Sequence, residues 1–236
     1  MKKSGKKYIE KAKLIDKSKK YSPTDAFALI KKTAIAKFDE SVDLAMKMGV
    51  DPKKSAVRGT VMLPAGSGKT SKVAVIAKVD KHKEATDAGA DVVGADDLVQ
   101  KISGGFLDFD VVLATPDMMG VVGKVGKILG TKGLMPNPKT GTVTFDIAKT
   151  VQEYKKGKVE FKMDKTGALH MLLGKVSFGE TDLEKNFYSA LSAIVKAKPS
   201  GTKGVYVKSI TLSSSMGPGI KIDAPLVMEE LEKKEL

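Results

Sequence analysis

The alternation of apolar and polar residues is clearest toward the two ends of the chain. Segment 37–48 places Phe38, Glu40 and several apolar side chains on one face, which predicts a strand with one buried side. Strands are also predicted at 57–63, 159–163, 168–173 and 205–212, the second and third joined by a hairpin turn at 164–167. Helical spacing appears in 22–34, after an N-cap signal at Ser22, and in 183–195, after a capping box at 181–184.

Between these ends, short apolar strands alternate with helices. Strands are predicted at 73–79, 91–94 and 110–114, and helices at 82–88, 95–103, 118–129 and 146–156. Within the strand predicted at 110–114, the residues after Asp110 are all apolar, as is typical of a parallel strand buried on both faces. The alternation predicts a parallel α/β sheet.

Neither flank forms a complete domain alone, so the simplest arrangement joins the two and inserts the middle between them. The fold class predicted is α/β with two domains. One is a discontinuous α+β (split β-α-β) domain of residues 1–67 plus 159–228, and the other is an inserted Rossmann-like α/β domain of residues 68–158. Linkers near 66–70 and 156–158 would form a hinge. Residues 1–20 are expected to be a disordered lysine-rich arm, 51–54 a turn, and 229–236 a C-terminal tail of weak helical character.

Segment 118–145 combines many glycines with four lysines and no acidic residue. Its first part predicts a helix that Gly130 ends, followed by a loop that Gly133, Pro136 and Pro138 keep from becoming helical. Such a loop lets backbone N–H groups approach an anion closely. A tight connection between a helix and a strand explains the same residues, and both interpretations stay open.

The charge of the chain favours a polyanionic partner. It carries 41 basic and 28 acidic residues, a net charge of +13, and its only arginine is Arg58. Because lysine contacts phosphate as a point charge, specificity is expected from shape, backbone groups and small polar side chains. The chain has no cysteine and only two isolated histidines, which argues against a metal or cofactor site. No apolar run is long enough for a membrane span, so a soluble cytoplasmic protein is expected.

Two enzyme signals are weak. Segment 66–70, GSGKT, resembles a phosphate-binding loop, but Leu63 stands where that motif needs glycine, and a strand rather than a helix is predicted after it. The other is a phosphometabolite enzyme built on the middle segment, which would need a general base or a nucleophile in a pocket. The segment offers several aspartates, and its one histidine, His82, is expected to be exposed. The aspartates are Asp91, Asp96, Asp108, Asp110 and Asp117. We therefore expect no catalysis and no catalytic residue. A general basic nucleic-acid-binding scaffold is the other alternative.

Residues 185–222 contain six lysines and no acid, and within them lies the segment 213–219, SSSMGPG. Hydroxyl groups can bond a 2′-OH or a phosphate, small residues allow close approach of the backbone, and methionine packs on an exposed sugar or base. The segment is thus either an RNA-binding surface or a loop without a partner.

Residues 123–144, GKVGKILGTKGLMPNPKTGTVT, resemble the signature of the bacterial large-subunit ribosomal protein L-one family, and the similarity extends from about Lys7 to Asp223. The resemblance implies the same two-domain fold, with the discontinuous domain as the main RNA-binding domain. It implies a constituent of the 50S subunit that binds 23S ribosomal RNA in the mobile stalk near the exit site. It further implies contact with exit-site transfer RNA and help in its release, translational repression through the messenger of its own operon, and a monomer when free.

Matching positions one by one, the resemblance places RNA contacts on both flanks of the chain. They are Lys37, Phe38 and Ser41 with Glu40 positioning them, Thr166, His170, Ser209, Ser215, Met216 and Gly217. Ser215 stands where threonine is common in the family, so the hydroxyl is kept and a methyl group is lost. An auxiliary RNA surface is expected on the middle segment at Lys124, Lys127, Lys132 and Lys139.

Overall fold

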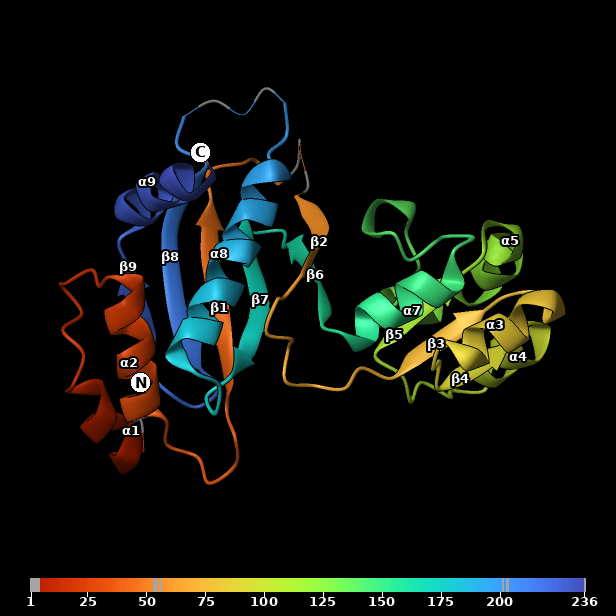
Figure 1. The fold of residues 1–236 in the computed structure, drawn as a ribbon, viewed down its shortest axis with the longest axis horizontal. Coiled ribbons are helices and arrows are strands. Elements are labelled where there is room, and N and C mark those ends of the chain that lie inside the picture. The colour runs from red at the N-terminus through yellow and green to blue at the C-terminus, as the bar shows by residue number, and fades with distance from the viewer. Residues whose placement is uncertain (1–4, 53–54, 56, 201, 203, 236) are drawn as a thin grey trace. The chain divides into compact units, whose positions relative to one another are not determined.

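The computed structural model describes residues 5–52, 55, 57–200, 202 and 204–235, and the chain folds as two compact units (Figure 1). The first, here called the terminal unit, joins Met1–Gly68 with Val159–Leu236. The second, the inserted unit, is the continuous segment Lys69–Lys158. The two ends of the chain therefore fold together.

A sheet forms the frame of the terminal unit. In spatial order its strands are β2 (Arg58–Met62), β6 (Lys158–Met163), β7 (Ala168–Lys175), β1 (Ser41–Met48), β8 (Val207–Ser214) and β9 (Ile220–Ile222). Strand β1 pairs antiparallel with both β7 and β8, which follow the inserted unit in sequence. The N-terminal flank thus supplies the central strand, and the C-terminal flank supplies its two neighbours.

Three helices cover one face of this sheet: α2 (Pro23–Thr33), α8 (Glu180–Lys196) and α9 (Ala224–Glu235). Figure 1 shows α8 running across β1 and β7. Alternate side chains of β1 are buried, beginning with Val42 and Leu44, and Phe27 of α2 meets Phe187 of α8 edge to face at 5.8 Å between ring centroids. As predicted, Ser22 caps α2, its hydroxyl accepting a hydrogen bond from the Asp25 amide at 3.2 Å.

The inserted unit is built on a parallel sheet in the order β4 (Val92–Gly94), β3 (Val73–Ile76), β5 (Val111–Ala114). Side chains of β3 alternate between two apolar cores, so the sheet is buried on both faces. One core includes side chains of α4 (Asp96–Ser103), α5 (Met119–Val122) and α6 (Gly126–Lys132), and the other includes side chains of α3 (His82–Asp87) and α7 (Ile147–Lys155). The predicted fold class, a mixed α/β chain containing a parallel sheet, is confirmed.

The helix predicted at 118–129 differs in the structure. A 3₁₀ turn at Pro116–Met118 precedes it, another at Gly123–Val125 divides it, and its last part, α6, continues past Gly130 to Lys132. Gly133, with φ of 75°, is the residue that ends it, because a helix C-terminus closes most easily through a left-handed residue. Further 3₁₀ turns occur at Val79–Lys81 and Pro138–Thr140.

Three boundaries in the terminal unit were also wrong. Helix α8 begins at Glu180 after Gly179, and no side chain caps it, so the capping box predicted from Thr181 does not form. Strand β1 begins only at Ser41, which leaves residues 37–40 in a loop and the Phe38 ring outside the core, 61% exposed. The strand predicted at 205–212 is shifted to Val207–Ser214.

The two ends of the chain are more ordered than the sequence indicated. Within the segment expected to be a disordered arm, Lys6–Ala12 forms helix α1, and Ile15 is buried in the core. The C-terminal segment forms α9, whose Val227 and Leu231 side chains are buried. Residues 1–4 of the expected arm, Lys53 and Lys54 of the expected turn, and Leu236 lie outside the described residues.

Candidate nucleic-acid interface

The face of the terminal sheet opposite α2, α8 and α9, here called the open face, carries polar and half-exposed side chains. Directly paired residues of neighbouring strands point to the same side of a sheet. On the open face, Lys47 of β1 pairs with Ser209 of β8, and Ala45 pairs with His170 of β7 and with Thr211. The open face is therefore lined by hydroxyl, imidazole and ammonium groups.

At the Ser41 end of β1, the loop of residues 34–40 meets the loop of residues 215–217. The buried Glu40 carboxylate joins them: Oε1 accepts hydrogen bonds from the amides of Ile35 (2.7 Å) and Ala36 (2.6 Å), and Oε2 accepts one from the Met216 amide (3.1 Å). One side chain thus fixes two loops that are far apart in sequence.

Electrostatics favour the ionised form of Glu40. Burial by itself raises the pKa of Glu40, but the nearby Ser214 hydroxyl and hydrogen bonds from the amides of Ala36, Met216 and Ile35 outweigh it and hold the pKa below its ordinary value. The carboxylate is therefore a permanent acceptor for these amides near neutral pH.

Ser41 and Gly217 add to this junction. The Ser215 amide donates to the Ser41 carbonyl at 3.0 Å, and the Ser41 amide donates to the Ser215 hydroxyl at 3.1 Å. A Cβ atom on Gly217 would lie 2.3 Å from the Ser214 hydroxyl oxygen, closer than real Cβ atoms approach. Only glycine fits here without movement of the buried Ser214 side chain.

Two large apolar side chains project from the same loops without entering the core. Phe38 is 61% exposed and Met216 is 58% exposed. A ring and a thioether left in solvent beside hydroxyl groups and Lys37 form a surface on which an unpaired base or a sugar can pack.

The remaining predicted contacts lie toward the other end of β1. The Thr166 hydroxyl bonds both carboxylate oxygens of Asp164 in the β6–β7 turn, at 2.7 and 2.8 Å, and the Thr166 carbonyl accepts from Lys47 Nζ at 2.6 Å. His170 and Ser209 are exposed in mid-strand. From Ser41 to Lys47, β1 spans roughly 20 Å at about 3.4 Å per residue.

Sequence reasoning missed two lysines at this interface. Lys47 is visible in the alternation of β1, because it occupies the polar side. Lys175 gave no local signal: its Nζ reaches the Ser41 hydroxyl at 3.0 Å because β7 pairs with β1 there, past a bulge between Val42 and Asp43. Asp43 places a carboxyl group at the centre of the face. Burial raises the pKa of Asp43, and the charges of Lys175 and His170 lower it only in part.

The auxiliary positions lie in the inserted unit. Lys124, Lys127, Lys132 and Lys139 are all exposed, on the 3₁₀ turns and helix α6 that hold the glycine-rich segment. Each of them is therefore a surface cation of that unit.

Two of the aspartates considered for an enzyme, Asp91 and Asp110, are engaged in structural contacts. Asp91 accepts hydrogen bonds from the Val73 amide (2.8 Å) and Lys155 Nζ (2.6 Å). Asp110 accepts one from Lys69 Nζ at 2.6 Å, which lowers the pKa of Asp110 and makes it a poor general base. The described part of the chain contains no cluster of three side chains able to hold a metal ion, and no helix in it is long and apolar enough to cross a bilayer.

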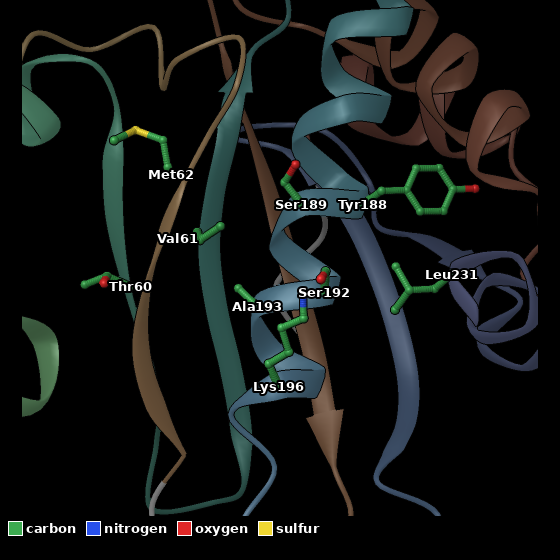
Figure 2. A pocket seen from close by; sticks show the side chains of 9 residues that line it. All are labelled: Thr60, Val61, Met62, Tyr188, Ser189, Ser192, Ala193, Lys196 and Leu231. Carbon is green, nitrogen blue, oxygen red and sulfur yellow. The ribbon is translucent and has the colours of Figure 1, made fainter. Parts of the chain in front are cut away.

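A hollow of about 470 Å³ lies between β2, α8 and α9, on the helix-covered side of the terminal sheet (Figure 2). Its lining offers hydroxyl groups, including those of Ser189 and Ser192, and the amine of Lys196, but neither a carboxylate nor an imidazole. A transfer or hydrolysis reaction needs a base beside its nucleophile. The hollow therefore gives the enzyme alternative no support.

The comparison with known families decides between the remaining alternatives. The model of the Ribosomal protein L1p/L10e family matches residues 30–218. The chain belongs to this family. As a member of the Ribosomal protein L1p/L10e family it is a large-subunit ribosomal protein that binds ribosomal RNA, and the family is one of structural proteins rather than enzymes.

The family assignment predicted from the sequence is confirmed. The matched range contains every position at which RNA contact was predicted, from Lys37 to Gly217, and also the auxiliary lysines. Helices α1 and α9 lie outside the matched range.

Proposed function

We propose that the open face of the terminal unit, with the loops at the Ser41 end of β1, is the surface that grips a folded segment of 23S ribosomal RNA. The observation that carries the proposal is the junction at Glu40, which brings exposed Phe38 and Met216 together with the Ser41 and Ser215 hydroxyls. A rigid surface of this kind recognises RNA by its shape, its 2′-OH groups and its unpaired bases.

The sign of the charged side chains changes along β1. Lys37 and Lys175 at one end and Lys47 at the other can approach phosphates, whereas Asp43 between them repels a phosphate and favours base or sugar contacts at the centre. Thr166, His170 and Ser209 then bind the RNA backbone at the far end. The exposed lysines of the inserted unit, Lys124, Lys127, Lys132 and Lys139, form an auxiliary contact.

Competition tests specificity. Labelled 23S ribosomal RNA bound to the protein is challenged with unlabelled 23S ribosomal RNA and, separately, with bulk transfer RNA. We expect displacement by the first at concentrations at least tenfold lower than by the second. Equal displacement by both would support the rival function, a general basic nucleic-acid scaffold.

We extend the proposal to the roles that the resemblance implied. In the cytoplasm, as part of the mobile stalk of the 50S subunit, the protein contacts exit-site transfer RNA and assists its release. It also binds the messenger of its own operon and represses its translation through the same surface, because a messenger fold that mimics the ribosomal segment would meet the same groups. Adding the protein to cell-free translation should lower synthesis from that messenger but not from one lacking its leader; equal effects on both would refute repression.

A further inference from the structure

Helix α1 forms one wall of a hollow beside the proposed RNA surface. The hollow has a volume of about 390 Å³ and is lined by Gly5, Lys7 and Tyr8 on one side and by Ile35 and Met216 on the other. Met216 is one of the exposed side chains of the proposed surface, so the hollow continues that surface toward the N-terminus. Neither Lys7 nor Tyr8 belongs to the set of contacts predicted from the sequence.

The segment that follows α1 holds the helix in place. Ile15 is buried in the terminal core, Lys11 Nζ donates to the Lys32 carbonyl of α2 at 2.6 Å, and the Tyr21 hydroxyl accepts from the Asp16 amide at 2.9 Å. The wall is therefore fixed relative to the loops opposite it.

Helix α1 itself contains no buried residue. Tyr8 is 38% exposed and Ile9 is 44% exposed, so the fold keeps an aromatic ring at the hollow without using it to stabilise the core. Such a ring is available to a ligand.

Charge and shape indicate what that ligand is. The hollow offers a ring, a thioether and an aliphatic side chain, and Lys7 of α1 adds an ammonium group to its lining. Its volume lies within the range of pockets that hold small ligands. An apolar lining beside an ammonium group suits an unpaired base attached to a phosphate, because the base can stack on the ring while the ammonium group meets the phosphate.

We infer that this hollow takes one unpaired nucleobase of the bound RNA, which stacks on Tyr8 and packs against Met216 while Lys7 contacts its phosphate. The inference rests on the proposed function, since it places an additional nucleotide of the same RNA. It makes Tyr8 a binding residue of a helix outside the matched range of the family.

The test uses the full-length protein and the fragment of 23S ribosomal RNA that it protects from ribonuclease. We expect Tyr8→Ala to weaken binding roughly 5- to 150-fold, the range of loss for one stacked base. Tyr8→Phe keeps the ring and should bind as the wild type does. Ile9→Ala is the matched control, because Ile9 is an exposed apolar residue of the same helix that does not line the hollow.

A second readout separates stacking from a structural effect. Each unpaired nucleotide of the protected fragment is replaced in turn by an abasic one, and the affinities of wild type and Tyr8→Ala are compared. One abasic position should weaken the wild type and leave Tyr8→Ala almost unchanged, as expected for two partners of one contact. Thermal unfolding confirms that each variant is folded.

The outcomes distinguish the two proposals. If the wild type protects no ribosomal RNA fragment, the proposed function fails and the hollow with it. If the wild type binds but Tyr8→Ala binds equally well, or if every abasic position affects both proteins alike, the nucleobase site is overturned and the proposed function stands.

Discussion

At the scale of single residues, the proposed surface depends on Glu40 more than on the side chains that would touch RNA. Its carboxylate accepts hydrogen bonds from the amides of Ile35, Ala36 and Met216, and it is buried while doing so. Buried amides without an acceptor are costly, so the position tolerates few replacements.

We predict that Glu40→Gln lowers the free energy of unfolding by about 1–3 kcal/mol, because the amide NH₂ of glutamine faces a backbone N–H and leaves it unpaired. Urea unfolding measures this, and Glu229→Gln, an exposed change on α9, is the control with little expected effect. The difference between wild type and Glu40→Gln should also depend on pH. Since the pKa of Glu40 is lowered on folding, the carboxylate contributes its full stabilisation above pH 4.5, its ordinary pKa, and loses it as the pH falls through the lowered value. A difference that grows on acidification would contradict this.

Met216 gives a test of the surface itself. We predict that Met216→Asp weakens binding to 23S ribosomal RNA far more than Lys132→Ala does, because an added carboxylate in the main surface repels phosphates and removes an apolar contact. Leu226→Asp is the control: Leu226 is also an exposed apolar residue of the terminal unit, but it lies on α9, which covers the opposite face of the sheet. Filter binding measures all three variants, and equal losses would refute the ranking.

At the scale of elements, Gly130 and Gly133 of the α6 segment have opposite roles. Gly130 lies inside α6, where an added Cβ would meet nothing within 4 Å, whereas Gly133 ends the helix with φ of 75°. Only the second needs the conformational freedom of glycine.

We therefore predict that Gly133→Ala destabilises the protein by about 1 kcal/mol, because alanine is strained in a left-handed conformation. Gly130→Ala should stabilise it by about 0.5–1 kcal/mol, because alanine in a helix loses less conformational entropy. Thermal unfolding of the pair compares the same chemical change three residues apart. Effects of the same sign would show that the helix ends elsewhere.

At the scale of the whole molecule, the two flanks of the chain make one sheet, and the inserted unit interrupts the sequence but not that sheet. The turn of residues 213–219 meets the loop of Phe38 through Glu40, and His170 lies on the same open face, paired with Ala45. A single RNA segment could therefore reach both ends of β1.

The charge of the molecule leads to a prediction about salt. With about six lysines near phosphates, affinity for 23S ribosomal RNA should fall roughly 10³-fold between 50 and 200 mM monovalent salt, because binding releases counterions from the RNA. Equilibrium filter binding across a salt series measures the slope. An affinity that does not change with salt would rule out the lysine-lined surface as the RNA-binding site.

The sequence by itself determined the fold class, the buried side of most strands and the basic character of the surface. It could do so because periodicity and charge are local properties: the alternation in β1 and the apolar run of β5 each identify a strand within a few residues. It failed at boundaries such as Thr181 and Gly130, where the fold around a helix end selects its first or last residue.

Only the tertiary structure decided how the candidate residues meet. Ser41 and Ser215 are 174 positions apart and are joined because β8 pairs with β1, and Lys175 reaches Ser41 only through the register of β7. The hollow beside Tyr8 likewise depends on Ile15 being buried, which no spacing in a lysine-rich segment reveals. Contacts between distant segments depend on strand register and core packing, and neither property is encoded in any single stretch of sequence.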